Sequence, residues 1–188
     1  MTYGDRFVLR DVNMTIERGE TLAVVGPSGT GKSTLLRLLI GLDRPTSGQV
    51  WVNGKELSGM REKELDEVRL GMGMVFQYSA LFDSMSVGEN VAFGLRQHTD
   101  MEEDEIRRIV DERLEGVGLA GLADAMPNEL SGGMKKRVGL ARALAFKPNI
   151  ILYDEPSSGL DPIMSRKIDA LILETQAKFG VTSVVVTH

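Results

Sequence analysis

The sequence has no cysteine and a single tryptophan in 188 residues, and aromatic residues make up only 5% of it. A chain without cysteine forms no disulfide and no thiolate metal site, which fits a reducing compartment. Positively charged residues are also outnumbered: the chain has 22 lysine and arginine residues and 27 aspartate and glutamate residues, for a formal net charge of −5. Nonspecific binding to nucleic acid needs clustered positive charge, so we expect no nucleic-acid partner.

Long apolar runs are missing as well. No stretch approaches the roughly 20 apolar residues that cross a bilayer, and the run "VTSVVV" at 181–186 has only the length of a strand. The first residues, "MTYGDRFVLR", lack the charged and then apolar layout of a signal peptide. Hydrophobic residues at 42% and charged residues at 26% are ordinary values for a globular protein. We expect a soluble, cytoplasmic chain that reaches a membrane only through a partner.

Short apolar runs alternate with helical stretches along the chain. Those with the length of a buried strand are "TLAVVG" at 21–26, "MGMVF" at 72–76, "IILYDE" at 150–155 and "TSVVVT" at 182–187. A helix is expected over 32–40, and the alternation predicts an α/β fold with a mainly parallel core sheet. The runs 7–20 and 48–57 favour strands of an N-terminal antiparallel β subdomain, the first ending at a turn of Arg18 and Gly19.

Between residues 77 and 127 the pattern becomes helical. The stretch 99–119 begins with a polar cap and an acidic first turn, and its apolar residues share one helical face: Ile106, Ile109, Val110, Leu114 and Val117. We expect one domain over 1–188, with 1–76 and 147–188 forming the core and its β subdomain and 77–146 a helical subdomain. The last strand stops at His188 with no helix after it, so we expect a C-terminally truncated domain.

A glycine-rich loop, "GPSGTGKS", follows the first buried strand and precedes the first helix. This is the P-loop pattern, in which backbone N–H groups and the start of a helix converge on phosphate oxygens. Lys32 is expected to bridge the β- and γ-phosphates of a nucleotide, and the Ser33 hydroxyl to bind Mg²⁺. The predicted phosphate-binding residues are Gly26, Pro27, Ser28, Gly29, Thr30, Gly31, Lys32, Ser33 and Thr34.

Two acidic residues, Asp154 and Glu155, end the strand "IILYDE". We expect this strand to lie next to the P-loop strand, so that Asp154 holds Mg²⁺ through water. Glu155 is then the natural general base for an attacking water molecule. Kinases, GTPases and motor proteins share these features. These residues alone therefore predict only that the chain binds and hydrolyses some nucleotide.

A second phosphate-binding pattern, "LSGGMKKR" at 130–137, narrows the choice, because it resembles the signature motif of ATP-binding-cassette (ABC) ATPases. Other positions then follow that family's order. The resemblance implies that Gln77 senses Mg²⁺ and the γ-phosphate, that His188 contacts the γ-phosphate, and that Tyr3 stacks on adenine. It also implies that Asp161, in "SGLD", reaches across a dimer interface, although "GLDP" equally fits a turn and helix cap.

The resemblance explains why one chain carries two phosphate-binding patterns. A Ser-Gly-Gly turn at a helix start can bind a γ-phosphate through a hydroxyl, backbone amides and the helix dipole. In the family that phosphate belongs to ATP held by the P-loop of another subunit. We therefore expect a second copy of the chain, packed head to tail, to bring Ser131, Gly132 and Gly133 to each ATP.

Within the family, "GMGMVFQYSALFDSMSVGENVAF", "LSGGMKKRVGLARAL" and "ILYDEPSSGLDPI" resemble the Mkl/MlaF-type ATPases. The resemblance implies phospholipid or other hydrophobic-substrate transport with an MlaE-like integral membrane permease and an MCE-type substrate-binding protein. The chain would then lie at the cytoplasmic face of the inner membrane, held there by the permease, with residues 78–82 docking a permease helix. Alternatives are another ABC importer, or a soluble non-transport ABC ATPase acting on DNA or ribosomes. The helical insertion is short and without heptads, which disfavours the chromosome and repair members.

Overall fold

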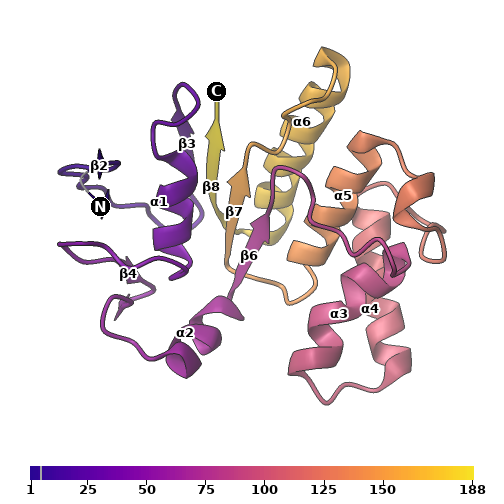
Figure 1. Ribbon diagram of the computed structural model, residues 1–188. Coiled ribbons are helices and arrows are strands. Elements are labelled where there is room, and N and C mark those ends of the chain that lie inside the picture. Colours follow the sequence, from indigo (N-terminus) through magenta and orange to yellow (C-terminus); the bar gives the residue numbers. More distant parts are fainter. Residues whose placement is uncertain (5) are drawn as a thin grey trace.

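A computed structural model of the chain describes residues 1–4 and 6–188. Its centre is a four-stranded sheet whose neighbouring strands are all parallel, as the sequence predicted (Figure 1). The strands lie in the order β3-β8-β7-β6, and their bounds are Thr21–Val25, Thr182–Thr187, Ile150–Asp154 and Met72–Val75. Because the strands are parallel, their carboxyl ends meet at one edge of the sheet, which is where the functional side chains gather.

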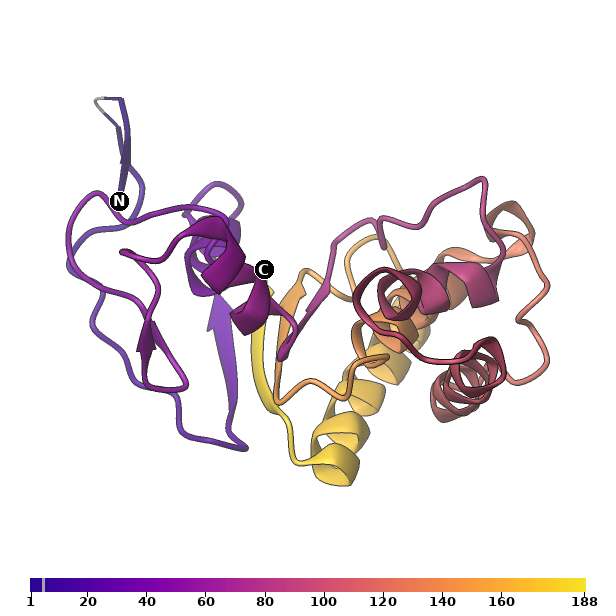
Figure 2. The same ribbon diagram turned by 90° about the horizontal axis from the view of Figure 1, so that it is seen from below.

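Alternate residues of the middle strands face two separate hydrophobic cores. In β7, Ile151 and Tyr153 belong to the larger core, whereas Leu152 belongs to the smaller one. The larger core is made with α3 (Val87–His98), α4 (Glu103–Gly116), α5 (Gly132–Ala143) and α6 (Pro162–Phe179). The smaller one is made with α1 (Lys32–Leu39) and α2 (Glu62–Arg69). Figure 2 shows these two groups of helices on opposite sides of the sheet.

Strand β3 departs from the sequence prediction in two ways. We expected it to be buried on both faces, but Ala23 and Val25 are exposed, because only Leu22 and Val24, on the other face, pack against the smaller core. We also expected the strand that ends in Asp154 to lie beside it. Instead β8 lies between β3 and β7. Two apolar runs that look alike in sequence can occupy a central and an edge position, since strand order depends on packing.

The N-terminal antiparallel subdomain forms only in part. Two separate hairpins are present, β1 (Thr2–Tyr3) with β2 (Arg6–Phe7) and β4 (Trp51–Val52) with β5 (Lys55–Glu56). The predicted strand over 7–20 is wrong beyond Phe7, because residues 8–20 run as irregular chain, although the turn at Arg18 and Gly19 is confirmed.

The helical region follows its capping signals. The predicted helix is α4, with an acidic first turn and with Ile106, Val110 and Leu114 buried. Ahead of it, α3 starts at a capping box, in which the amide of Glu89 donates to the hydroxyl of Ser86 at 3.2 Å. A short 3-10 helix, η1 (Pro127–Glu129), leads into α5. No helix within residues 1–4 and 6–188 is long and apolar enough to cross a membrane.

Candidate nucleotide site

The P-loop connects the end of β3 to the start of α1. The amide of Gly26 donates to the carbonyl of Thr187 at 3.3 Å, which ties the loop to the end of β8. Helix α1 then begins at Lys32, directly after Gly31. The first N–H groups of a helix have no partner inside it, so the start of α1 offers donors and the positive end of its dipole to the loop.

Gly31 meets two constraints that only glycine satisfies. Its φ of +94° lies in the left-handed region, and a Cβ atom there would stand 2.9 Å from Val8 Cγ1 and 3.0 Å from the Val8 carbonyl oxygen. A side chain at position 31 would therefore push the N-terminal segment off the loop. Gly29, with a φ of +79°, has open space around it, so conformation alone favours glycine at that position.

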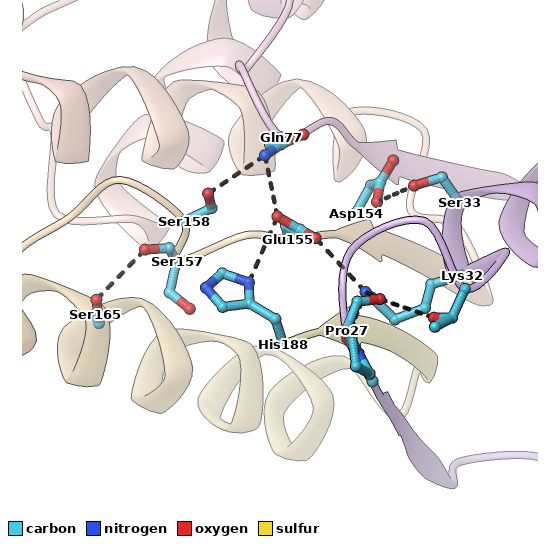
Figure 3. A network of polar contacts seen from close by, with 12 residues as sticks. Pro27, Lys32, Ser33, Gln77, Asp154, Glu155, Ser157, Ser158, Ser165 and His188 are labelled. Carbon is cyan, nitrogen blue, oxygen red and sulfur yellow. Dashed lines mark hydrogen bonds and ion pairs between the residues drawn. The ribbon is translucent and has the colours of Figure 1, made fainter.

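Lys32 fills the middle of the loop. Its side chain is 7% exposed, and the ammonium donates to the carbonyls of Gly26 at 2.7 Å and Pro27 at 3.0 Å. The same nitrogen lies 3.8 Å from Oε1 of Glu155 (Figure 3). A positive charge is thus fixed between the loop and the acidic end of β7. Pro27 has no N–H group, and in this arrangement it contributes only its carbonyl.

Ser33, in α1, and Asp154, at the end of β7, meet although they are 121 residues apart in the sequence. The Ser33 hydroxyl donates to Oδ1 of Asp154 at 2.9 Å (Figure 3). Hydroxyl and carboxylate oxygens are ligands that Mg²⁺ accepts, and it usually completes its shell with water and substrate phosphates. In the described part of the chain no three His, Cys, Asp or Glu side chains cluster to hold a metal by themselves. The donor set therefore fits a cation that is shared with a phosphate.

Glu155 is the centre of the polar network. Its Oε2 accepts from the Gln77 amide nitrogen at 3.0 Å and lies 3.6 Å from Nδ1 of His188, which is itself 62% exposed (Figure 3). The backbone of Glu155 is left-handed, with a φ of +45°, a conformation that costs roughly 1–3 kcal/mol in a residue other than glycine. Its amide donates to the Val186 carbonyl at 3.0 Å, which helps to hold this turn.

Sequence reasoning missed Lys136, which reaches this network from α5. The side chain is 7% exposed, and its ammonium donates to the carbonyls of Gln77 at 3.0 Å and Glu155 at 3.3 Å. Burial lowers the pKa of Lys136, and the charge of Glu155 opposes that shift. Position 136 lies within the signature motif, but that motif is recognised by its serine and glycines. Nothing in the sequence therefore marked Lys136 as a functional residue.

A pocket of about 380 Å³ unites the P-loop with Gln77 and Glu155. The predicted P-loop residues that line it are Ser28, Gly29, Gly31, Lys32, Ser33 and Thr34. Arg6 and Val8 also line it and were not predicted. Their position just after Tyr3 was the available signal, since the family places its adenine-stacking aromatic there. The side chain of Tyr3 itself lies outside the described part of the structure.

The second phosphate-binding pattern stands apart from this pocket. Ser131 caps α5, with its hydroxyl accepting from the Met134 amide at 3.3 Å, and both Ser131 and Gly132 are exposed. Gly133 is buried, and a Cβ atom there would stand 2.7 Å from Cε of Met164. None of these residues lines the pocket around Lys32.

Asp161 has a structural task that the sequence left open. Its Oδ1 accepts from the amides of Ile163 and Met164, both at 3.0 Å, and so caps α6. The helix-cap alternative is therefore confirmed. A role for Asp161 across a dimer interface stays a prediction.

Comparison with known proteins agrees with this geometry. The model of the family described as ABC transporter matches residues 9–158. A probable ribonucleotide transport ATP-binding protein, mkl, of Mycobacterium tuberculosis is 48% identical over 187 residues, covering 100% of this chain and 52% of its own. The intermembrane phospholipid transport system ATP-binding protein MlaF of Escherichia coli K12 is 44% identical, covering 100% and 70%. The chain thus spans about half the length of the mycobacterial relative.

Solved structures agree as well. The post-hydrolysis dimer of the ATP-binding cassette MJ0796 bound to ADP and Pi has a TM-score of 0.89 and 37% identity, covering 100% of this chain and 84% of that one. CbiO1 from Clostridium perfringens, part of the transporter complex cbiONQ, has a TM-score of 0.88 and 38% identity, covering 96% and 72%. The resemblance to Mkl/MlaF-type ATPases is confirmed, and the chain belongs to the ABC transporter family.

Proposed function

We propose that this chain is the ATP-binding and ATP-hydrolysing part of an ABC transporter. One observation carries the proposal: a single pocket brings together a buried lysine at a helix start, a serine bonded to Asp154, and a carboxylate bonded to a glutamine. Transfer of a phosphoryl group to water requires a positive charge at the phosphates, oxygen atoms that can bind a metal ion, and a base.

In this reaction Lys32 orients the β- and γ-phosphates, and Glu155 accepts a proton from the attacking water molecule. Gln77 and His188 hold the Glu155 carboxylate in place, since both contact its Oε2. Ser33, Asp154 and Gln77 would hold Mg²⁺, which supplies charge neutralisation at the phosphates when bound. Figure 3 shows these side chains pointing toward one another from the P-loop, the end of β7 and the end of β8.

The proposed site is completed by a second copy of the chain. Ser131 and Gly132 are exposed, sit at the start of α5 and lie outside the pocket of their own chain. A head-to-tail dimer gives each pocket the Ser131 turn of the partner, so two composite sites form. Two structures of MJ0796, at 37% and 38% identity, are dimeric, which supports a dimer here.

Replacing Lys32 with alanine tests the P-loop. We expect the affinity for ATP to fall at least tenfold, because the buried ammonium that faces the phosphates is lost. Equilibrium binding of a labelled, slowly hydrolysed ATP analogue measures the effect. Lys167→Ala, which removes an exposed lysine of α6, is the matched control and should bind like wild type. Equal affinity of the Lys32 and Lys167 variants would contradict the assigned site.

We further propose that the transporter moves a phospholipid or another hydrophobic substrate between membranes, with an MlaE-like permease and an MCE-type protein. The names of relatives support this in part: MlaF of Haemophilus influenzae, 45% identical, is named for phospholipid transport, whereas mkl is named for ribonucleotide transport. Purification from the native host separates the readings. Co-purification of a multi-spanning protein with bound phospholipid supports the proposal, and co-purification of nucleic acid or ribosomes supports a soluble ABC ATPase instead.

The proposed permease contact is the docking segment, Tyr78 to Phe82. Tyr78 is 86% exposed and Phe82 is 42% exposed, so both rings are available to a partner. Leu81, which we also expected to contribute, packs against the larger core instead. Phe82 packs against Phe93 as well, with ring centroids 4.8 Å apart, which leaves Tyr78 as the least constrained anchor.

Replacing Tyr78 with serine tests this contact. We expect loss of permease co-purification with unchanged ATP binding. A single aromatic side chain at the centre of an interface can contribute about 2 kcal/mol or more to the binding free energy. Leu173→Ser is the matched control, since it removes an exposed apolar side chain from α6, away from the docking segment. Retention of the permease by the Tyr78 variant would overturn the docking proposal.

A further inference from the structure

Helix α5 holds Gln77 and the first residues of the docking segment that follows it through two cations. Lys136 donates to the carbonyl of Gln77 at 3.0 Å, and Arg142 donates to the carbonyls of Ser79 at 2.7 Å and Ala80 at 2.6 Å. Three of four successive backbone acceptors are thus bound by side chains of one helix. Burial lowers the pKa of Arg142, and charge-assisted bonds to otherwise orphaned carbonyls offset the cost of burying it.

The held backbone is strained. Ser79 and Ala80 have φ values of +62° and +46°, a left-handed conformation that is unfavourable in residues other than glycine. Such a turn persists only where its surroundings impose it. Beyond the turn, the fully buried Asn90 of α3 donates to the Phe82 carbonyl at 3.1 Å and accepts from its amide at 2.8 Å. The segment is therefore fixed at both ends.

Lys136 also extends this connection into the catalytic network. Its second bond, 3.3 Å long, goes to the carbonyl of Glu155, while the side chains of Gln77 and Glu155 bond each other at 3.0 Å. The ammonium and the amide-carboxylate pair thus link the same two residues twice, once through backbone and once through side chains. Ser131 caps the same helix α5 that carries Lys136, five positions along it.

We propose, building on the proposed ATP hydrolysis, that Lys136 and Arg142 are positioning residues that make α5 and the Gln77–Ala80 backbone move as one body. Lys136 fixes where that body meets Glu155. Displacement of the docking segment is then passed to the Ser131 turn and to the Gln77–Glu155 pair together. The structure assigns this coupling to two side chains of α5 and not to the P-loop.

Lys136→Met removes the donors and keeps most of the side chain's bulk. Starting from a wild-type protein that hydrolyses ATP, we expect kcat to fall ten- to a hundredfold, because misplacing reacting groups by about 1 Å costs up to that much. ATP affinity should stay within threefold, since Lys32 is untouched. The Mg²⁺ concentration for half-maximal activity should rise at least threefold, because Gln77 loses its backbone anchor. Lys136→Gln, whose amide nitrogen carries two N–H donors, should keep at least a third of the wild-type kcat.

Arg137→Met is the matched control on the same helix. Arg137 also donates to backbone carbonyls, those of Val117 at 3.4 Å and Gly118 at 3.5 Å, but these lie in the turn after α4. We expect a lower Tm with kcat and Mg²⁺ dependence within twofold of wild type. A Lys136→Met protein that is less stable but unchanged in kcat and Mg²⁺ dependence would overturn the inference, and so would a Lys136→Gln protein as impaired as Lys136→Met.

Arg142→Lys is a second test of the inference, for the case that the Lys136→Met protein does not fold. Lysine keeps the charge but cannot span two carbonyls in the planar fork of a guanidinium, so the Mg²⁺ requirement should at least double. An unchanged requirement would overturn the inference. A wild-type protein that hydrolyses no ATP at all would instead refute the proposed function and leave these contacts as structural ones.

Discussion

Glu155→Gln is expected to lower ATP turnover at least a hundredfold while leaving ATP bound. General-base catalysis typically contributes 10²–10⁴-fold, and glutamine has no basic carboxylate to accept the proton from water. The amide keeps the size of the side chain, so its contacts with Gln77 and His188 are the least disturbed of any substitution. Phosphate release measures turnover, and binding of labelled ATP measures affinity in the same preparation.

The same variant should accumulate as an ATP-bound dimer, because ATP would join two chains and its hydrolysis would release them. Size-exclusion chromatography with mass detection, with and without ATP, reports this directly. Glu174→Gln removes an exposed carboxylate of α6 and serves as the control, with turnover expected to equal that of wild type. Turnover by the Glu155 variant within threefold of wild type would mean that another group is the base.

Glu155, the proposed general base, could be named from sequence because its signal is local. An acidic pair at the end of an apolar run, in a chain that also carries a P-loop, constrains the chemistry whatever the surrounding packing. The four core strands were predictable for the same reason, since continuous apolar runs of strand length need only be read along the chain.

The sequence predictions that were wrong concern features that depend on how distant segments pack. The order of the strands, which places β8 between β3 and β7, leaves no mark within "TLAVVG" or "IILYDE". Val25 is exposed because only the face of β3 that carries Leu22 and Val24 packs against a hydrophobic core. Residues 8–20 contain apolar positions typical of a strand but pair with no neighbouring strand in the described structure.

In the candidate site, too, residues in local motifs could be named from the sequence, whereas residues that contact distant backbone could not. Lys32, Ser33, Asp154 and Glu155 belong to motifs with fixed spacing, so the sequence named them as candidates, and the structure places them close together. Lys136 and Arg142 act through backbone carbonyls far away in sequence, with separations of 59 residues between Lys136 and Gln77 and of 63 between Arg142 and Ser79. A carbonyl is present at every position, so no residue type marks the partner of such a side chain.

Ser131→Arg is the variant whose effect depends most on two chains sharing one site. Removing the cap hydroxyl costs α5 about 1 kcal/mol, which the fold should tolerate. The Lys32 pocket does not include Ser131, so each chain should still bind ATP. Hydrolysis should fall at least a hundredfold, because a bulky cation now stands where a partner's γ-phosphate must dock. Ser131→Ala, which removes the hydroxyl without adding bulk, separates loss of the contact from obstruction.

Mixing two inactive variants gives the sharpest test of a shared site. In a dimer of one Ser131→Arg chain and one Glu155→Gln chain, one site pairs an intact Glu155 with an intact Ser131, and the other site has neither. An equimolar mixture, combined before ATP is added, should recover about a quarter of wild-type activity if the two sites work independently, because half of the dimers are mixed. A chain carrying both substitutions, mixed with either single variant, should recover none. If both single variants are folded and the mixture stays inactive, the proposal of two independent sites, each shared between two chains, is wrong.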